Sequence, residues 1–450
     1  MSNAKIPNMM IWLILLVTFV LRMINLNQSL WLDEAINVNV AKALSYKSLI
    51  FNYSLGDFHP PLYHIILKSW ILFFGSSEIS VRIPSVILGV ATVFVTYLIG
   101  KKLFENKTAL IAATLMATSP LSIYYSQEAR MYMLAAFFAS LSVFFFISIL
   151  KKDDFWLWFG FIISTALMLY SDYLPYLLIP IYFLYLLINK RKVAKNTLKS
   201  FIPAFILISI LITPWLIILP KQISVGLSAA TASPAWAQVV GAPSIQNLLI
   251  TFVKFTIGRI SYDNNLVYAL LFAPAAFFII FLFLLSLFRM SPLRFFLWFW
   301  FFGPVFLGFL TRSLLFLALA VNLTSATFYF LIPRFQRENW REATSYVIQN
   351  SSQKTISLFE SDYPPGPFDY YSRGQVKAEG ALNGYNADQS KVREKLNVLT
   401  QDKQKVFLFQ YLSGITDPAG LVFQELTRLG FKNTRTRDFN GVGFVYEFER

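Results

Sequence analysis

Long apolar runs separated by short polar or basic loops dominate the first three quarters of this chain. A helix needs about 20 apolar residues to cross the hydrocarbon core of a bilayer. Segment 62–74 is apolar but too short to cross, so we predict an in-plane or re-entrant helix there. Membrane-spanning helices are predicted at about 9–25, 83–100, 108–124, 131–150, 155–171, 173–189, 199–219, 266–288, 293–310 and 314–333.

The basic loops between these runs orient the predicted bundle. Loops rich in Lys and Arg favour the cytoplasmic side, and Lys101–Lys107, Lys151–Lys152 and Asn189–Lys195 all fall on one side. The N-terminus falls there too, because its long apolar run has no cleavage site and is predicted to be a retained span. The first loop, segment 126–130 and Asp172 then lie on the opposite, extracytoplasmic side.

Two further changes in pattern define the organisation of the chain. Segment 220–263 is rich in Ser, Ala, Gly and Pro, and we predict a long external loop that acts as a lid or binding element. After residue 333 charges and turns increase and strand-like runs appear, such as Gly443–Phe448. The predicted fold class is an all-α polytopic membrane domain over 1–333, with about 10–12 transmembrane helices, and a small soluble α/β or α+β domain over 334–450. A count of ten crossings places that domain in the cytoplasm.

Composition supports a membrane protein and excludes several kinds of site. The chain is 56% hydrophobic and 14% charged, against about 25% charged residues in soluble domains. It has no Cys, which excludes disulfides and thiolate chemistry, and only two His, which excludes a His-rich metal site. The net charge of +15 fits cytoplasmic anchoring loops and an anionic lipid or phosphate ligand. Nucleic acid is not expected as a partner, because no basic region interleaved with aromatics lies outside the predicted spans.

Two polar clusters in the first loop are the strongest candidates for chemistry. Asp33 and Glu34 follow the first span, and His59 and His64 flank a Pro-Pro pair. Carboxylates beside a bilayer are costly and are usually functional, so Asp33 could serve as a general base toward a hydroxyl. The alternative is a solvated acidic pair at the start of a helix. The two His side chains could bind a phosphate or simply pack at the interface.

Other candidates lie at the same predicted end of the bundle. Arg82 opens a span and could either bind a phosphate or act as a snorkelling anchor. Glu128 and Arg130 could face the same cavity or form an exposed ion pair of little energetic value. Asp172 could be an ordinary turn residue, and Arg259 lies in the long external loop.

The order of these motifs resembles the C-type (GT-C) membrane glycosyltransferases. Asp-Glu follows the first span, then His-Pro-Pro-Leu-Tyr, Arg-Ile-Pro-Ser and Tyr-Ser-Gln-Glu-Ala-Arg-Met-Tyr. The branch that it resembles includes the protein O-mannosyltransferases and the aminoarabinose transferase of lipid A, and the likeness is close over about 9–190. One departure is that Thr311–Phe316 runs directly into the final apolar stretch, where the family usually has a further span.

The resemblance implies an inverting glycosyltransferase that uses a polyprenyl-phosphate-linked sugar. It places Asp33 at the catalytic carboxylate, with Glu34 beside it, and His59, Arg82, Glu128 and Arg130 around the donor. It also implies that the soluble domain is external. We add His64, Asp172 and Arg259 as candidate substrate-binding residues.

We therefore expect a glycosyltransferase of the prokaryotic plasma membrane with an extracytoplasmic active site. Its partners would be the lipid-linked donor, membrane lipid, and an acceptor that is a lipid, glycan or protein. We expect no cofactor and no metal, with a divalent cation left open. The alternative function is a transporter or flippase for lipid-linked sugars, which would need the basic residues but no base.

Overall fold

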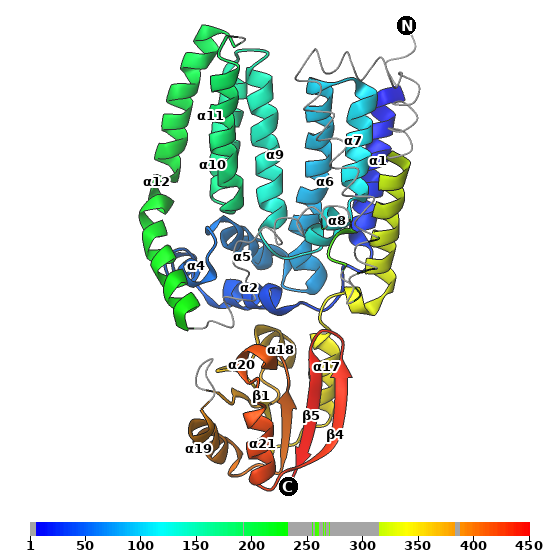
Figure 1. Cartoon of the computed structure of the whole chain (residues 1–450), viewed down its shortest axis with the longest axis vertical. Coiled ribbons are helices and arrows are strands. Elements are labelled where there is room, and N and C mark those ends of the chain that lie inside the picture. Colours follow the sequence, from blue (N-terminus) through cyan, green and yellow to red (C-terminus); the bar gives the residue numbers. More distant parts are fainter. Residues whose placement is uncertain are drawn as a thin grey trace.

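The computed structural model describes residues 6–191, 193–232, 315–382 and 388–450, together with residues 254, 257–260, 264, 266 and 270. Figure 1 shows a bundle of long helices and, at one of its ends, a sheet covered by shorter helices. This arrangement confirms the predicted fold class, a helical membrane bundle with a small α/β part. The division of the chain at residues 333 and 334 remains a prediction.

The long helices run between the two ends of the bundle. Helix α6 begins where the Ser77 side chain accepts a hydrogen bond from the amide of Ser80, and its 26 residues extend for about 39 Å. That length exceeds the hydrocarbon thickness of a bilayer. The bundle comprises α1 (Ile6–Met23), α6 (Glu78–Leu103), α7 (Asn106–Thr118), α8 (Pro120–Ser126), α9 (Tyr132–Ile149), α10 (Phe155–Leu169), α11 (Leu178–Ile188), α12 (Lys195–Ala232) and the helix Leu315–Leu331.

Within the described residues, three helices are long and apolar enough to cross a membrane, namely α6, α9 and α12. A fourth span results if α7 and α8, which meet at a bend of 59°, are counted together. The other predicted spans that are described correspond to shorter apolar helices. Apart from residues 266 and 270, the predicted spans 266–288 and 293–310 lie outside the described residues, as does most of the Thr311–Phe316 departure.

The connections between helices are grouped at the two ends of the bundle as the sequence predicts, while the membrane side of each end remains a prediction. Figure 1 shows that the three basic loops lie at the end of the bundle farthest from the sheet, as does the start of α1. The helix Leu315–Leu331 ends beside the sheet. The start of α1 and the end of the helix Leu315–Leu331 thus lie at opposite ends of the bundle, so an odd number of crossings must separate them. The predicted count of ten crossings is therefore wrong by at least one. The C-terminal part lies on the same side as the first loop, as the resemblance implied.

Short helices of the first loop cover the end of the bundle that faces the sheet. Helix α5 (Leu62–Phe74) has the predicted bounds and lies at this end instead of running along the bundle. Helix α2 (Leu32–Ala43) lies across the same end (Figure 1). The remaining elements here are α3 (Tyr46–Ser48), η1 (Leu49–Tyr53), α4 (Ser54–Asp57) and η2 (Leu174–Leu177).

The predicted external loop 220–263 begins too early. Helix α12 continues through Pro220 to Ala232, so thirteen residues assigned to the loop are helical. Contacts with α4 and with the loop that follows it explain the extension: Gln222 Nε2 donates to the carbonyls of Ser54 at 2.5 Å and His59 at 3.3 Å. Sequence composition alone does not reveal such tertiary contacts. Most of the remaining loop lies outside the described residues.

The C-terminal part is a five-stranded mixed sheet in the order β2-β1-β3-β5-β4. Strands β2, β1 and β3 are parallel, and β5 is antiparallel to both β3 and β4. Side chains alternate between its faces: Val406 and Leu408 enter one core, and Phe407 and Phe409 enter the other. The elements are η3 (Pro333–Phe335), α17 (Trp340–Gln349), β1 (Thr355–Phe359), α18 (Gly366–Ser372), β2 (Ala378–Gly380), α19 (Gln389–Thr400), β3 (Lys405–Phe409), α20 (Ser413–Thr416), α21 (Leu421–Arg428), β4 (Lys432–Phe439) and β5 (Gly443–Glu449).

Direct hydrogen bonds join this part to the first loop. Asn39 Nδ2 donates to the carbonyl of Gly366 at 2.9 Å. A Cβ atom at Gly366 would lie 2.7 Å from Ile36 Cγ1, so the close approach of α18 to α2 requires glycine. The amide of Leu30 donates to Tyr371 Oη at 2.8 Å. The chain segment that carries Asp33 and Glu34 is therefore held between the bundle and the sheet.

Candidate active site

The first turn of α2 places Asp33 and Glu34 at the junction between the two parts. Its amide-rich N-terminal end favours acidic side chains, and the amide of Trp31 donates back to Glu34 Oε2 at 3.4 Å. Consecutive helix residues point about 100° apart. The two carboxylates therefore face different surroundings.

Glu34 forms a fully buried ion pair with Arg82. Arg82 Nε and Nη2 donate to the two carboxylate oxygens at 2.8 and 2.5 Å, and the amide of Ala129 donates to Oε1 at 2.7 Å. Burial alone would raise the pKa of Glu34, but the Arg82 charge and these hydrogen bonds hold it below its usual value. Glu34 is thus a buried, ionised carboxylate with no access to a substrate.

Arg82 has no hydrogen available for a phosphate. A guanidinium has five N–H donors, and here all five are used. Two go to Glu34, and the others go to the carbonyls of Leu26, Gln28 and Ser29. The predicted role of Arg82 as a phosphate ligand therefore does not fit its surroundings, and its contacts are those of a residue that fixes the loop before α2.

Asp33, by contrast, is accessible. Its side chain is 32% exposed, and Arg130 Nη1 lies 3.4 Å from its Oδ2 atom. Burial raises the pKa of Asp33, as do the charges of Asp57 and Glu34, although Arg130 acts in the opposite direction. Arg130 Nε is buried and has no hydrogen-bond partner, so this guanidinium retains a donor. A carboxylate with a raised pKa beside a cation is suited to proton transfer.

The His59–His64 motif is organised by Asp57. His64 Nε2 lies 3.0 Å from Asp57 Oδ2, and Tyr53 Oη donates to Oδ1 at 3.3 Å. His59 Nδ1 lies 2.7 Å from the carbonyl of Asp57, and a carbonyl only accepts, so Nδ1 carries the hydrogen and Nε2 is left for another partner. Burial would raise the pKa of Asp57, but hydrogen bonds from His59 and His64 hold it well below its usual value. His64 is buried, whereas His59 reaches the surface.

Glu128 pairs with a residue far along the chain. Arg337 Nη1 and Nη2 both lie 3.2 Å from Glu128 Oε2, and the Arg337 guanidinium stacks 3.8 Å from the centre of the Tyr124 ring. Arg259 lies over the same ring at 5.5 Å and, unlike Arg337, is exposed. The bend between α7 and α8 directs the following segment, which carries Glu128 and Arg130, toward the first turn of α2.

Asp172 does not belong to this cluster. Its Oδ1 atom accepts a hydrogen bond from the amide of Leu174 at 3.1 Å, as in an ordinary Asx turn. No hydrogen bond or ion pair within the described residues links it to Asp33, His59 or Arg130. The alternative interpretation of Asp172 as a turn residue fits the structure.

Asp57, Arg337 and Glu338 are cluster residues that sequence reasoning missed. Glu338 accepts hydrogen bonds from the amide of Leu32 at 3.3 Å and from Tyr411 Oη at 3.0 Å. Burial raises the pKa of Glu338, and the charge of Asp33 adds to this. Their positions in the sequence could have indicated them, because Asp57 lies two residues before His59 and the Arg337–Glu338 pair follows the last predicted span.

The cluster combines one accessible carboxylate with cations and an imidazole nitrogen. Its other acids are already engaged: Glu34, Asp57 and Glu128 are each paired with Arg or His, and Glu338 accepts hydrogen bonds from Leu32, Trp340 and Tyr411. In the described part of the chain, no three His, Asp or Glu side chains are grouped as metal ligands would be. The arrangement can remove a proton at Asp33 and can bind an anion at Arg130 and Arg259.

Comparison with known sequences identifies relatives over the part that carries this cluster. Residues 58–218 match the family described as dolichyl-phosphate-mannose-protein mannosyltransferase. YkcB of Bacillus subtilis, whose name proposes a mannosyltransferase, is 24% identical over 214 residues, which is 45% of this chain and 29% of YkcB. An uncharacterised protein of Aquifex aeolicus is 26% identical over 169 residues, covering 37% of this chain and 34% of that protein. The matched regions thus span about a third of these relatives.

Solved structures share the fold over almost the whole chain. ArnT from Cupriavidus metallidurans in the apo state matches with a TM-score of 0.51 and 11% identity, covering 98% of this chain and 97% of ArnT. The oligosaccharyltransferase AglB from Archaeoglobus fulgidus matches with a TM-score of 0.52 and 12% identity, covering 98% of this chain and 74% of AglB. These likenesses confirm the predicted fold class. The resemblance to the GT-C glycosyltransferases is borne out by these structures taken together with the family match and the YkcB match.

Proposed function

We propose that this GT-C-fold membrane protein is an inverting glycosyltransferase that moves a sugar from a polyprenyl-phosphate carrier to an acceptor hydroxyl. The observation that carries the proposal is the environment of Asp33. Its carboxylate is accessible and lies beside Arg130. Glu34, Asp57 and Glu128 are held by Arg or His, and Glu338 by hydrogen bonds from Leu32, Trp340 and Tyr411. We therefore assign the base to Asp33.

In the proposed reaction, Asp33 Oδ accepts the proton of the acceptor hydroxyl as its oxygen attacks the anomeric carbon of the sugar. The bond between that carbon and the phosphate oxygen breaks, and its electron pair leaves with the lipid phosphate. Attack from the face opposite the leaving group inverts the configuration at the anomeric carbon. General-base assistance of this kind contributes about 10²–10⁴ in rate.

We assign the leaving phosphate to Arg259 and to the positive charge of Arg130. Arg259 is exposed beside the Tyr124 ring, and Arg130 lies beside Asp33. Preorganised cations aimed at a developing negative charge often make the greatest single contribution to catalysis. His59 Nε2 is free to bind a sugar hydroxyl or a phosphate oxygen. Glu34, Arg82, Asp57, His64, Glu128 and Arg337 act as positioning residues.

The matched family and the ligands of a structural neighbour favour this donor. The matched family is described by dolichyl-phosphate-mannose, and AglB was solved with a dolichol-phosphate and an inhibitory peptide. We therefore propose a polyprenyl-phosphate-linked sugar as donor and a lipid, glycan or protein as acceptor. The plasma membrane is the proposed location, with the cluster on its outer face. Because Arg259 and Arg130 can match the phosphate charge, we propose transfer without a cofactor or metal.

The test is product formation by the purified full chain in nanodiscs. Mass spectrometry of the co-purified lipids identifies the carrier, and that carrier is then supplied with its sugar and a membrane extract as the source of acceptor. We expect a glycosylated product with inverted anomeric configuration. Retention of configuration would contradict the mechanism, and loss of transfer on chelation with recovery in Mg²⁺ would contradict the absence of a metal.

A flippase would give a different result. In proteoliposomes it would move the lipid-linked sugar between leaflets while leaving the sugar on its carrier. Translocation without a product in the presence of acceptor would therefore replace the transferase proposal.

A further inference from the structure

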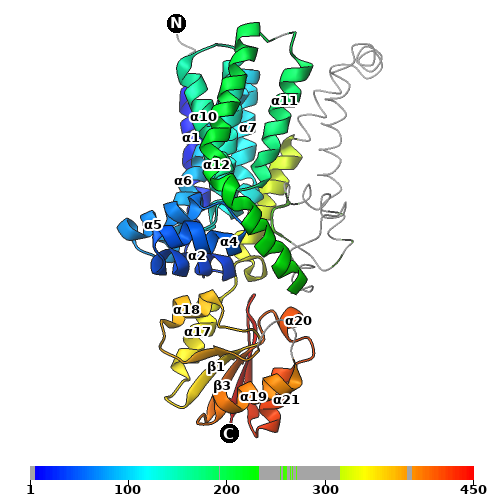
Figure 2. The same cartoon turned by 90° about the vertical axis from the view of Figure 1, so that its left-hand side faces the viewer.

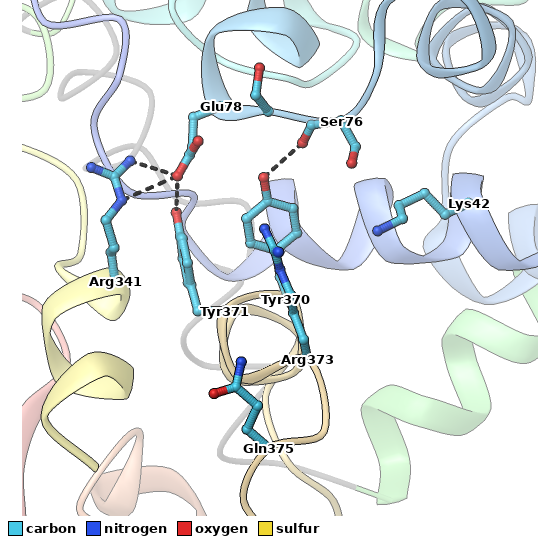
Figure 3. Close-up of a pocket in the computed structure, with 9 residues that line it drawn as sticks. Lys42, Ser76, Glu78, Arg341, Tyr370, Tyr371, Arg373 and Gln375 are labelled. Carbon is cyan, nitrogen blue, oxygen red and sulfur yellow. Dashed lines mark hydrogen bonds and ion pairs between the residues drawn. The ribbon is translucent and has the colours of Figure 1, made fainter. Parts of the chain in front are cut away.

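A polar cavity of about 680 Å³ lies where α18 meets the connection between α5 and α6. Figure 3 shows its walls, with Lys42 from α2 and Arg373 from the end of α18 directed into the same space. Lys42 is nine residues beyond Asp33 on α2, a distance of about 13 Å along the helix. The cavity is therefore separate from the candidate active site.

Fixed contacts between the two parts of the chain form the walls of this cavity. Arg341 Nη2 and Tyr371 Oη donate to Glu78 Oε1 at 2.6 and 3.1 Å. Tyr370 Oη donates to the carbonyl of Ser76 at 2.7 Å (Figure 3). The single carboxylate in the wall is thus already neutralised by Arg341.

The two remaining cations have no such partner. Within the described residues, neither Lys42 nor Arg373 makes a side-chain hydrogen bond or an ion pair. Counting Lys42, Arg341 and Arg373 against Glu78, the lining carries a net charge of +2. Two unpaired cations from different elements that converge on one cavity favour an anionic ligand of compact charge. Lys supplies a point charge and Arg a two-pronged donor, which together suit a phosphate.

The surroundings of the cavity place it beside lipid. Leu72, Phe73 and Phe74, at the end of α5, are exposed, with Phe73 81% exposed. They are followed, after Gly75, by Ser76 in the cavity wall. Figure 2 shows α5 at the edge of the helical part, with α18 below it. Apolar side chains that enter the acyl region next to basic residues at headgroup level are the usual pattern of an interfacial lipid contact.

We propose that this cavity binds the phosphate headgroup of an anionic membrane phospholipid. The headgroup phosphate lies between Lys42 and Arg373, and its acyl chains lie against Leu72 and Phe73. Such a lipid links α2 to α18 and so reinforces the junction that holds the first loop. The proposal concerns lipid binding alone and does not depend on the transferase activity.

The test uses the full chain in nanodiscs of phosphatidylcholine with increasing phosphatidylglycerol, and native mass spectrometry counts the phosphatidylglycerol molecules that remain bound. We expect the double variant Lys42→Gln/Arg373→Gln to lose about tenfold or more in affinity, since each basic residue near an anionic lipid contributes roughly fivefold. The charge-matched control is Lys47→Gln/Lys377→Gln, at two exposed positions outside the lining. It should bind as the wild type does.

Two further arms decide the outcome. The conservative variant Lys42→Arg should retain the lipid, and equal thermal unfolding of all variants excludes misfolding as a cause. Equal losses in the double variant and its control would overturn the proposal, because only general surface charge would then be at work. Glycerol phosphate that binds equally well in neutral nanodiscs would overturn the assignment to a lipid in favour of a soluble phosphate.

Discussion

Asp33 and Glu34 are consecutive residues of α2, yet their carboxylates have opposite environments. Glu34 is completely buried against Arg82, while Asp33 is 32% exposed beside Arg130. The helical rotation between neighbours separates the two, so Glu34 anchors the loop and Asp33 stays accessible beside Arg130. Substitutions of the two residues should therefore have different effects, on catalysis for Asp33 and on stability for Glu34.

Replacing the accessible carboxylate should remove catalysis and leave the protein intact. Asp33→Asn keeps the shape of the side chain but removes the base, so we expect turnover to fall by about 10²–10⁴. Binding of the lipid carrier and thermal unfolding should remain close to wild type. The measurements are single-turnover transfer in nanodiscs and mass spectrometry of the retained carrier.

Asp172→Asn is the matched control for this experiment. It makes the same chemical change at a turn aspartate outside the cluster, and it should keep nearly full activity. If Asp33→Asn transfers sugar as fast as Asp172→Asn, the base is another residue.

Replacing the buried carboxylate should instead affect stability. Removing one partner of a buried ion pair costs about 3–5 kcal/mol, because the remaining charge is left uncompensated. We therefore expect Glu34→Gln and Arg82→Met each to lower the free energy of unfolding by about that amount. The double variant should lose less than the sum of the two, which a double-mutant cycle of unfolding in detergent would measure.

The pH dependence of this effect has a definite sign. The folded state lowers the pKa of Glu34 from its ordinary value of 4.5. The pair therefore stabilises the protein above that pH, and this contribution is lost as the pH falls through the lower, folded pKa. The stability of Glu34→Gln should depend less on pH in this range than that of the wild type. Additive losses in the cycle would show that the pair is not coupled.

Much of the architecture could be predicted because it depends on local composition. The apolar segment 62–74 became α5 with the same bounds, and Gly443–Phe448 lies within β5. The length of an apolar run and the alternation of apolar and polar residues in a strand can both be seen in a short stretch of sequence. The candidate site was partly visible for the same reason, since Asp33, His59 and Arg130 each lie in a short polar motif between apolar runs.

Pairings between distant residues could not be predicted in this way. Nothing near Glu128 indicates that its partner is Arg337, 209 positions later. The burial of Glu34 and the exposure of Asp33 depend on where Arg82 and the amide of Ala129 lie in space. Helix α12 extends past Pro220 because Gln222 finds partners on α4 and in the following loop. Each of these outcomes is set by tertiary contacts that local sequence does not encode.

The acidic limb of the pH–activity profile should report Asp33. The base must be ionised, and burial together with Asp57 and Glu34 raises its pKa above the ordinary value. Activity should therefore fall at a higher pH than an ordinary aspartate would give. Arg130→Met removes the main opposing charge, so we expect the acidic limb of kcat/KM to move to still higher pH. Arg130→Lys keeps the positive charge and should shift the acidic limb much less. If Arg130→Met leaves the acidic limb unchanged, the group that titrates there is not Asp33.

The end of α12 should control access to His59. Gln222 is buried, donates to the carbonyls of Ser54 and His59, and accepts from Tyr173 Oη. In Gln222→Ala those carbonyls lose their donor, at a cost of about 1–3 kcal/mol. We expect faster amide hydrogen exchange over residues 220–232 and a several-fold higher KM for the lipid-linked donor, with kcat changed less.

Tyr173→Phe is the partial control for that change. It removes one hydrogen bond from Gln222 but leaves both carbonyl contacts in place, so its exchange and KM should lie between wild type and Gln222→Ala. A purely structural role for Gln222 would lower the unfolding temperature without moving KM. Equal exchange in wild type and Gln222→Ala would show that other contacts hold the end of α12 against α4.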